Sequence, residues 1–349
     1  MLTYSILVLL ILLCRNSFFS IASIDIREKT ENKFCYFIWA LIILLAALRS
    51  DKVGADTPGY MQDYKDIALM SFSDIFDRWD TYLGYYVPSK LFSMLGAPQW
   101  LWFGFVELVY AFAVQRFINK YSADKLLSIL VFVCCGLFCF SLAGLKQTFA
   151  MAFMLHAFVF FVDKKYKYAV PCLVIAYLSH SSSLMFLPAF AFYYIKNYRL
   201  YLPVLVASIL GLYFAGDTFL INAVLWSGND HFETYLNFEN TYSSVTLIFY
   251  VSLLLFSCVG GKTYLKKRPE EAKMAYGYCL MACGLQILAS ISPSTFRLAY
   301  FYTPFYMVLL SNSTVGLSPG IAKLVRFVII VSIVFFFLYT NRDTPYSFM

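Results

Sequence analysis

Charged side chains are scarce in this sequence. Only 13% of the 349 residues are charged, whereas 61% are hydrophobic, and the mean hydropathy is +0.69. Soluble domains carry roughly a quarter charged residues, so this composition excludes a soluble protein. The aromatic-rich runs lack the ten-residue alternation of barrel strands, and helices of ~20 apolar residues remain as the spanning elements. The sequence therefore predicts an all-α, polytopic integral membrane protein.

Motifs that mark common enzyme chemistries are missing as well. The sequence has three histidines, and its nine cysteines lie in apolar runs without metal-ligand spacing. It contains no glycine-rich phosphate loop, no H-E-x-x-H and no G-x-S-x-G. Nothing indicates ATP, zinc or a serine hydrolase, so we expect no metal and no cofactor.

The apolar runs predict about twelve transmembrane helices. They lie at about 2–22, 34–48, 99–117, 125–142, 147–162, 167–180, 183–196, 200–215, 243–260, 274–291, 297–312 and 321–340. We expect one transmembrane domain, residues 1–349, with two long segments at about 49–98 and 216–242. In the first of these, apolar residues at helical spacing from Phe72 to Leu83 indicate an interfacial helix, and residues 85–95 indicate a re-entrant segment.

The basic residues predict the orientation of these spans. The net charge is +7, and most lysines and arginines occupy alternate short loops. The positive-inside rule makes those loops cytoplasmic, so the two long segments face outward. The excess positive charge therefore reports orientation, and we expect no nucleic-acid partner.

Several polar residues fall at the predicted outer ends of spans. Arg49 and Asp56 lie in the turn that ends the second apolar run, Lys146 and Gln147 open one helix, and Arg297 opens another. Free backbone N–H groups and the dipole at a helix N-terminus favour an anion, and arginine binds phosphate bidentately. These cations suit a phosphate or pyrophosphate; an ordinary solvated turn and a snorkelling lysine are the alternatives.

The remaining ionisable groups within spans have less obvious roles. His180 ends a span in a tight hairpin, where it is either a proton-transfer group or a cap of its own helix. His156 lies ten residues inside its span and is expected to be packed or to bridge helices. The sequence names no partner for the intramembrane Glu107, and we expect Arg15 to snorkel.

Three ordered motifs together resemble a known family. They are R-x4-G-x-D-T-x2-Y from Arg49 to Tyr60, L-K-Q-x2-A from Leu145 to Ala150, and S-H-S-S-S from Ser179 to Ser183. In this order they resemble the EpsG-type branch of the Wzy polysaccharide polymerases, over residues from about 35 to 300. Two departures are that Lys146 stands where the family more often has arginine, and that the carboxylate expected after the first outer segment has no clear match.

The resemblance implies a glycosyltransferase of the bacterial cytoplasmic (inner) membrane. It would join O-antigen, capsule or exopolysaccharide repeat units carried on undecaprenyl pyrophosphate at the periplasmic face, without metal or nucleotide sugar. The implied partners are the lipid-linked glycan donor and acceptor, membrane lipid, a chain-length regulator and other assembly proteins. A GT-C-like architecture is an open alternative for the fold.

On this hypothesis the cations bind the leaving group, because displacing a polyprenyl pyrophosphate requires positive charge there. We assign this role to Arg49, Lys146 and Arg297. The candidates for contacts with the acceptor hydroxyl or the sugars are His180, Asp56, Gln147 and Tyr60.

Four other functions compete with this one. A lipid-linked oligosaccharide flippase or transporter suits twelve spans, but it should line a path across the membrane with polar groups. An O-antigen ligase uses the same donor, and a membrane O-acyltransferase would use a deep histidine such as His156. A purely structural assembly partner fits the outer cations least well.

Overall fold

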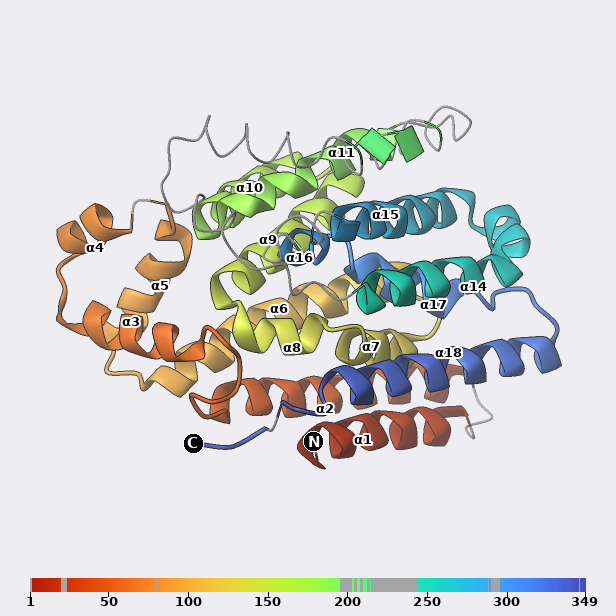
Figure 1. The fold of residues 1–349 in the computed structure, drawn as a ribbon, viewed down its shortest axis with the longest axis horizontal. Coiled ribbons are helices and arrows are strands. Elements are labelled where there is room, and N and C mark those ends of the chain that lie inside the picture. The colour runs from red at the N-terminus through yellow and green to blue at the C-terminus, as the bar shows by residue number, and fades with distance from the viewer. Residues whose placement is uncertain are drawn as a thin grey trace. The chain divides into compact units, whose positions relative to one another are not determined.

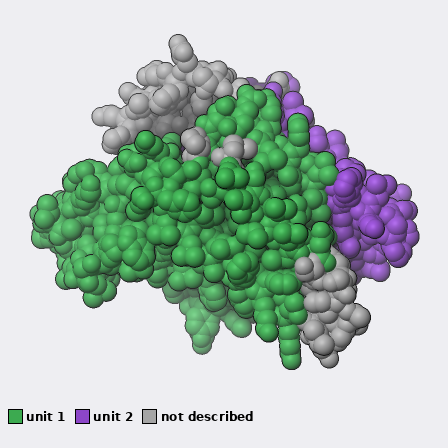
Figure 2. Space-filling view, turned by 90° about the horizontal axis from the view of Figure 1, so that it is seen from below, with its two compact units in different colours: residues 1–184, 330–349 green, residues 185–329 purple. Residues whose placement is uncertain are grey.

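The computed structural model describes residues 2–19, 24–79, 81–194, 244–287, 289, 296–344 and 346–349, with six single positions between 203 and 214. Within these ranges the chain is helical and forms no strand, apart from one antiparallel bridge between Arg49 and Phe348. The predicted all-α class is therefore confirmed. The chain divides into two compact units, residues 1–184 with 330–349 (unit 1) and residues 185–329 (unit 2) (Figure 2).

Unit 1 is built around three packed helices. Its helices are α1 (Leu2–Phe19), α2 (Ile24–Leu48), α3 (Thr57–Leu69), α4 (Phe72–Arg78), α5 (Leu83–Met94), α6 (Gln99–Tyr121), α7 (Lys125–Cys134), α8 (Leu137–Ala143), α9 (Leu145–Val162) and α10 (Tyr166–Ser179). Helix α9 packs against α6 and α10, α6 packs against α2, and α2 packs against α1 (Figure 1). Helices α3 and α5 pack on each other, and α5 also contacts α10.

Unit 2 is a smaller helical assembly. It contains the last two residues of the short helix η1 (Ser181–Phe186), then α11 (Leu187–Tyr194), α14 (Val245–Lys267), α15 (Pro269–Ile287), α16 (Phe296–Ala299), α17 (Pro304–Asn312) and the start of α18 (Pro319–Thr340). Helix α15 packs against α14, α16 and α17. Tyr306 of α17 stacks on Tyr250 of α14 and donates its hydroxyl hydrogen to the Tyr250 carbonyl at 2.9 Å.

Five helices in the described part are long and apolar enough to cross a membrane. They are Glu28–Leu48, Gln99–Tyr121, Leu145–Val162, Val245–Lys267 and Pro319–Thr340, and α7 with α8, bent by 52°, makes a sixth if the pair is one broken span. These match the predicted spans at 34–48, 99–117, 147–162, 243–260, 321–340 and 125–142. The protein is thus a multi-pass membrane protein by helix length and composition.

Among the described residues, the other six predicted spans do not coincide with a helix that is long and apolar enough to cross a membrane. Most of them fall on shorter or less apolar helices, and the run at 200–215 lies largely outside the described residues. The count of twelve therefore stays a prediction, as do the single transmembrane domain and the GT-C-like alternative. The predicted outer segment 216–242 lies outside the described residues.

The segment at 49–98 is mostly helical. The interfacial helix predicted from Phe72 to Leu83 is wrong in its length, because α4 ends at Arg78 and a separate helix begins at Leu83. The Trp79 ring stacks on Tyr86 with centroids 4.1 Å apart, which folds α4 back onto α5. A capping box between Ser71 and Asp74 fixes the start of α4.

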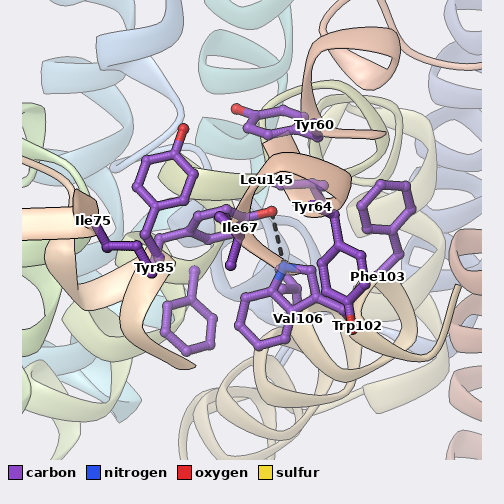
Figure 3. Packing of buried hydrophobic residues seen from close by; sticks show 11 residues of the cluster. Tyr60, Tyr64, Ile67, Ile75, Tyr85, Trp102, Phe103, Val106 and Leu145 are labelled. Atoms are coloured by element: carbon purple, nitrogen blue, oxygen red, sulfur yellow. Dashed lines mark hydrogen bonds between the residues drawn. The ribbon is translucent and has the colours of Figure 1, made fainter. Parts of the chain in front are cut away.

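A buried aromatic cluster holds α3, α5, α6 and α9 together (Figure 3). Tyr60, Tyr64 and Ile67 recur at helical spacing and bury one face of α3. Trp102 of α6 donates its indole N–H to the Tyr85 hydroxyl at 3.0 Å, so both buried polar atoms are satisfied. The cluster fixes the segment 49–98 to the apolar helices of unit 1.

Candidate functional site

The turn after α2 is locked onto the break between α8 and α9. Gly54 has a φ of +89°, and a Cβ at this position would lie 2.4 Å from the carbonyl oxygen of Leu142. Only glycine fits there. The Thr57 hydroxyl donates to the carbonyls of Val53 at 2.6 Å and Leu142 at 3.2 Å. The R-x4-G-x-D-T motif therefore places Asp56 and the start of α3 beside the N-terminus of α9.

Lys146 lies in the first turn of α9, inside a cage of three tyrosines. Its ammonium is 4.2 Å from the ring centroid of Tyr82, 5.2 Å from that of Tyr86 and 5.6 Å from that of Tyr60. Helix α9 has no side-chain N-cap at Gly144. Cation–π attraction to these rings holds the ammonium in place. Lys146 and the uncapped first turn of α9 therefore both contribute positive charge to this end of the helix.

A tyrosine connects this lysine to a carboxylate. The Lys146 ammonium donates to the Tyr86 hydroxyl at 3.2 Å, and that hydroxyl donates to Asp63 Oδ2 at 2.6 Å. Burial, followed by the bond to Asp63, raises the pKa of Tyr86, so its phenol stays protonated and remains a donor. Asp63 and Asp56 are the carboxylates that act electrostatically on Lys146.

The sequence analysis did not select Asp63 or Tyr86. Asp63 supplies a carboxylate close to the lysine, a role for which the sequence analysis had found no clear match. Its signal was its place on α3, three residues after Tyr60 and next to Tyr64, which puts it at the edge of the buried face. The contacts of Asp63 with Tyr86, and of Tyr86 with Lys146, join different helices and could not be predicted from the sequence.

His180 reaches the same region from the C-terminal end of α10. Its ring centroid lies 5.7 Å from that of Tyr82. This approach depends on Gly84 in α5, because a Cβ there would lie 2.6 Å from the Ser179 hydroxyl and 2.7 Å from the Ser179 backbone nitrogen. Nδ1 of His180 accepts the Ser182 backbone N–H at 3.3 Å, so a neutral ring carries its proton on Nε2.

Arg49 occupies a different environment. Its guanidinium is fully buried, lies 4.5 Å from the Phe103 ring centroid and donates Nη1 to the Ala46 carbonyl. Burial lowers the pKa of Arg49 to about 10, and the nearby Glu107 carboxylate opposes this shift. Within the described structure, Nε and Nη2 of Arg49 and both carboxylate oxygens of Glu107 make no hydrogen bond. Glu107 thus has a charged neighbour that the sequence did not name.

The turn, the caged lysine and the histidine come together in unit 1, although they are far apart in sequence. A family model described as the EpsG family matches residues 32–348. The chain belongs to the EpsG family. This confirms the resemblance and gives the protein a role of the polysaccharide-polymerase type, in a glycosyltransferase-like family. Comparisons with curated proteins and with solved structures gave no significant match.

In this EpsG family member, the remaining predicted site residues are placed as follows. Gln147 and Tyr60 are buried, at 3% and 8% exposed, so each is held by packing next to Lys146. Asp56 is half-buried at the start of α3. Arg297 lies in α16 of unit 2, so a pyrophosphate site shared by Arg297 and Lys146 stays a prediction.

Two further predictions about ionisable residues have clear outcomes. Arg116 of α6 donates Nη1 to Nδ1 of His156 in α9 at 3.4 Å, so the helix-bridging role of His156 is confirmed. The snorkelling predicted for Arg15 is wrong. Its guanidinium is buried and forms an ion pair with Asp124 at 2.7 Å, because the carboxylate that caps α7 lies within reach.

Proposed function

We propose that this protein polymerises oligosaccharide repeat units carried on a lipid pyrophosphate. The observation that carries the proposal is the caged ammonium of Lys146 at the uncapped N-terminus of α9, beside two carboxylates and a histidine. A site with one concentrated cation and adjacent carboxylates suits a reaction in which a pyrophosphate leaves and a hydroxyl loses its proton. Family membership supports the same class of reaction.

The reaction requires four changes at this site. The acceptor hydroxyl oxygen attacks the anomeric carbon of the donor sugar, and the bond from that carbon to the pyrophosphate oxygen breaks. The electron pair stays on the pyrophosphate, where Lys146 and the α9 N–H groups stabilise the charge. The proton of the acceptor hydroxyl passes to Asp56 or Asp63, which compete for the role of general base.

The other predicted residues orient the substrates. His180 donates Nε2–H to a sugar hydroxyl or to the acceptor, and Gln147 and Tyr60 contact sugar hydroxyls. Arg49 and Arg297 contribute positive charge toward the pyrophosphate, Arg49 after a local rearrangement that opens its buried position.

The finer features of the family resemblance belong to this proposal. They are an undecaprenyl carrier, twelve spans, an inner-membrane location and an active face on the periplasmic side. A chain-length regulator and other polysaccharide-assembly proteins are the proposed protein partners. Neither metal nor nucleotide sugar takes part.

The test is the polysaccharide ladder of a deletion strain complemented with variants. Lys146→Ala should leave single repeat units at the surface, Lys146→Arg should restore part of the ladder, and His180→Ala should reduce it. Lys65→Ala, which removes an exposed lysine of α3, is the matched control and should restore the full ladder.

Other outcomes would replace the proposal. A full ladder from a normally inserted Lys146→Ala variant would refute the assigned role of the lysine. A deletion that leaves no repeat unit at the surface would favour a flippase or a ligase. An unchanged ladder with altered acetylation would favour an O-acyltransferase.

A further inference from the structure

A groove of about 530 Å³ opens beside the turn after α2, within unit 1. Its walls are residues 50–52, Met61 of α3, Gln99 and Trp100 at the start of α6, and the segment 347–349. This volume lies within the range of sites that bind small molecules, roughly 300–1,000 Å³. None of the roles proposed above involves this groove.

Trp100 gives the groove an exposed aromatic surface. The side chain is 42% exposed, and within the described structure its indole has no ring partner and no hydrogen bond. The buried tryptophan of the same helix, Trp102, is fully enclosed and donates to Tyr85. A free indole offers a flat apolar face for the C–H groups of a sugar ring and a donor at its edge.

The polar side chains that line the groove have hydrogen-bonding groups that could bind a hydroxyl-rich ligand. Nε2 of Gln99 is buried and has no hydrogen-bond partner in the described structure. A buried donor without an acceptor costs roughly 1–3 kcal/mol, and rotation of the Gln99 amide toward a ligand oxygen in the groove would relieve this cost. Asp51 and Lys52 are exposed and form no ion pair with each other in the described region. The groove therefore offers an acceptor and several donors at once.

The groove lies on the other side of the first turn of α3 from the caged lysine. Tyr60 faces Lys146, whereas its neighbour Met61 lines the groove, so the first turn of α3 separates the two places. A helix is on the order of 10 Å across, which is within reach of an oligosaccharide that occupies both. The wall at 347–349 is fixed, because the Ser50 N–H donates to the Ser347 carbonyl at 2.9 Å and the Met349 N–H donates to the Leu48 carbonyl at 3.0 Å.

We infer that this groove is a glycan subsite, which holds sugar residues of the repeat unit or growing polymer while linkage occurs at Lys146. The inference rests on the proposed polymerase function for the nature of the ligand. Trp100 stacks on one sugar ring, and Gln99 and Asp51 hydrogen-bond its hydroxyls. Retaining the polymer between successive linkages makes the product longer, so the subsite acts on chain length and leaves the linkage step itself intact.

The direct test is binding of glycan fragments to the full-length protein in lipid nanodiscs. The probe is an oligosaccharide fraction prepared by mild acid hydrolysis of the polymer that the deletion strain lacks. Trp100→Ala should weaken binding about tenfold, because an aromatic anchor at the centre of a contact carries a large share of its energy. Trp100→Phe should retain most of the affinity. Leu101→Ala removes a neighbouring side chain of similar exposure, 43%, that does not line the groove, and should bind as wild type does.

Chain length in the complemented strain separates this inference from the proposed function. Trp100→Ala should shift the ladder to shorter chains, whereas Lys146→Ala should remove the ladder. A wild-type ladder and wild-type binding for Trp100→Ala would overturn the subsite and leave the polymerase intact. Reduced membrane insertion of Trp100→Ala, with wild-type binding by the inserted fraction, would make Trp100 a membrane anchor and would also overturn the subsite. A deletion strain with a normal ladder would refute the proposed function itself.

Discussion

Removing the Glu107 charge should destabilise the protein through Arg49. The guanidinium is fully buried, two of its nitrogens have no hydrogen-bond partner among the described residues, and Glu107 is the main opposite charge acting on it. Glu107→Gln keeps the shape of the side chain but leaves an uncompensated cation in the interior. Such a cation costs free energy that the native carboxylate offsets.

The size of the effect follows from the separation of the two charges. They form no direct ion pair, so their attraction is smaller than the ~4 kcal/mol expected at about 4 Å with an effective dielectric constant of about 20. We expect about 2 kcal/mol, equivalent to about a thirtyfold change in the unfolding equilibrium. Arg49→Met combined with Glu107→Gln should recover most of this loss, because the double variant has no buried charge at this place.

Buried thiols provide the assay. Cys134 and Cys135 of unit 1 are buried thiols that form no disulfide in the described structure, so a thiol-reactive fluorophore reports unfolding as temperature rises. Glu107→Gln should react at a lower temperature than wild type and than Asp77→Asn, which neutralises an exposed carboxylate. Equal unfolding temperatures for wild type and Glu107→Gln would refute the coupling between Glu107 and Arg49. Additive effects of the two substitutions in the double variant would refute it as well.

The contribution of Arg49 to folding stability changes with pH in a direction that its pKa determines. The pKa of Arg49 is lowered from 12.5 to about 10 in the folded protein, so between these values the unfolded chain binds more protons. Stability from this residue therefore rises with pH above about 10. The penalty of Glu107→Gln should shrink in that range, because a deprotonated Arg49 no longer needs a counter-charge.

Three other changes test the packing and polar contacts of the site. Gly84→Ala would drive a Cβ against the backbone of α10, within 2.7 Å of the Ser179 nitrogen, so it should abolish polymer formation, whereas Gly59→Ala meets nothing within 4 Å and should be silent in the same ladder assay. Tyr86→Phe breaks the link between Lys146 and Asp63 and should slow polymerisation about tenfold with normal insertion; an unchanged rate would show that the link is structural only. Ser71→Ala removes the cap of α4 and should cost about 1 kcal/mol of local stability, seen as faster hydrogen exchange over residues 72–78; unchanged exchange would show that the cap is dispensable.

Much of the fold was predictable because a membrane helix depends on local composition. The runs at 99–117, 147–162 and 243–260 satisfy their own backbone groups and need only apolar side chains to be recognised. The break between α4 and α5 was not predictable in the same way. Continuous helical periodicity runs through Trp79, whereas α4 ends at Arg78 and the Trp79 ring stacks on Tyr86 of the next helix.

The site was predictable where a motif encodes backbone geometry. Gly54 and Thr57 are required by contacts with a carbonyl, and Lys146 is placed by the helix that it opens. Asp63 and Tyr86 were missed because their role exists only when α3, α5 and α9 meet. Apart from the place of Asp63 at the edge of the buried face of α3, nothing in the sequence near either residue distinguishes it from an ordinary surface acid or a packed tyrosine.

The burial of Arg49 changes what its place in the motif implies. The sequence put it among the outer cations because it follows an apolar run, and such a position suits both a ligand contact and a helix terminus. Its guanidinium lies against Phe103, close to Glu107, at the point where the chain enters the turn that carries Asp56. The turn therefore has two anchors, Gly54 on the α8–α9 break and Arg49 in the interior. If Arg49 acts by holding the turn, Arg49→Lys should lower stability and polymerisation together, whereas a direct contact with pyrophosphate would lower polymerisation alone.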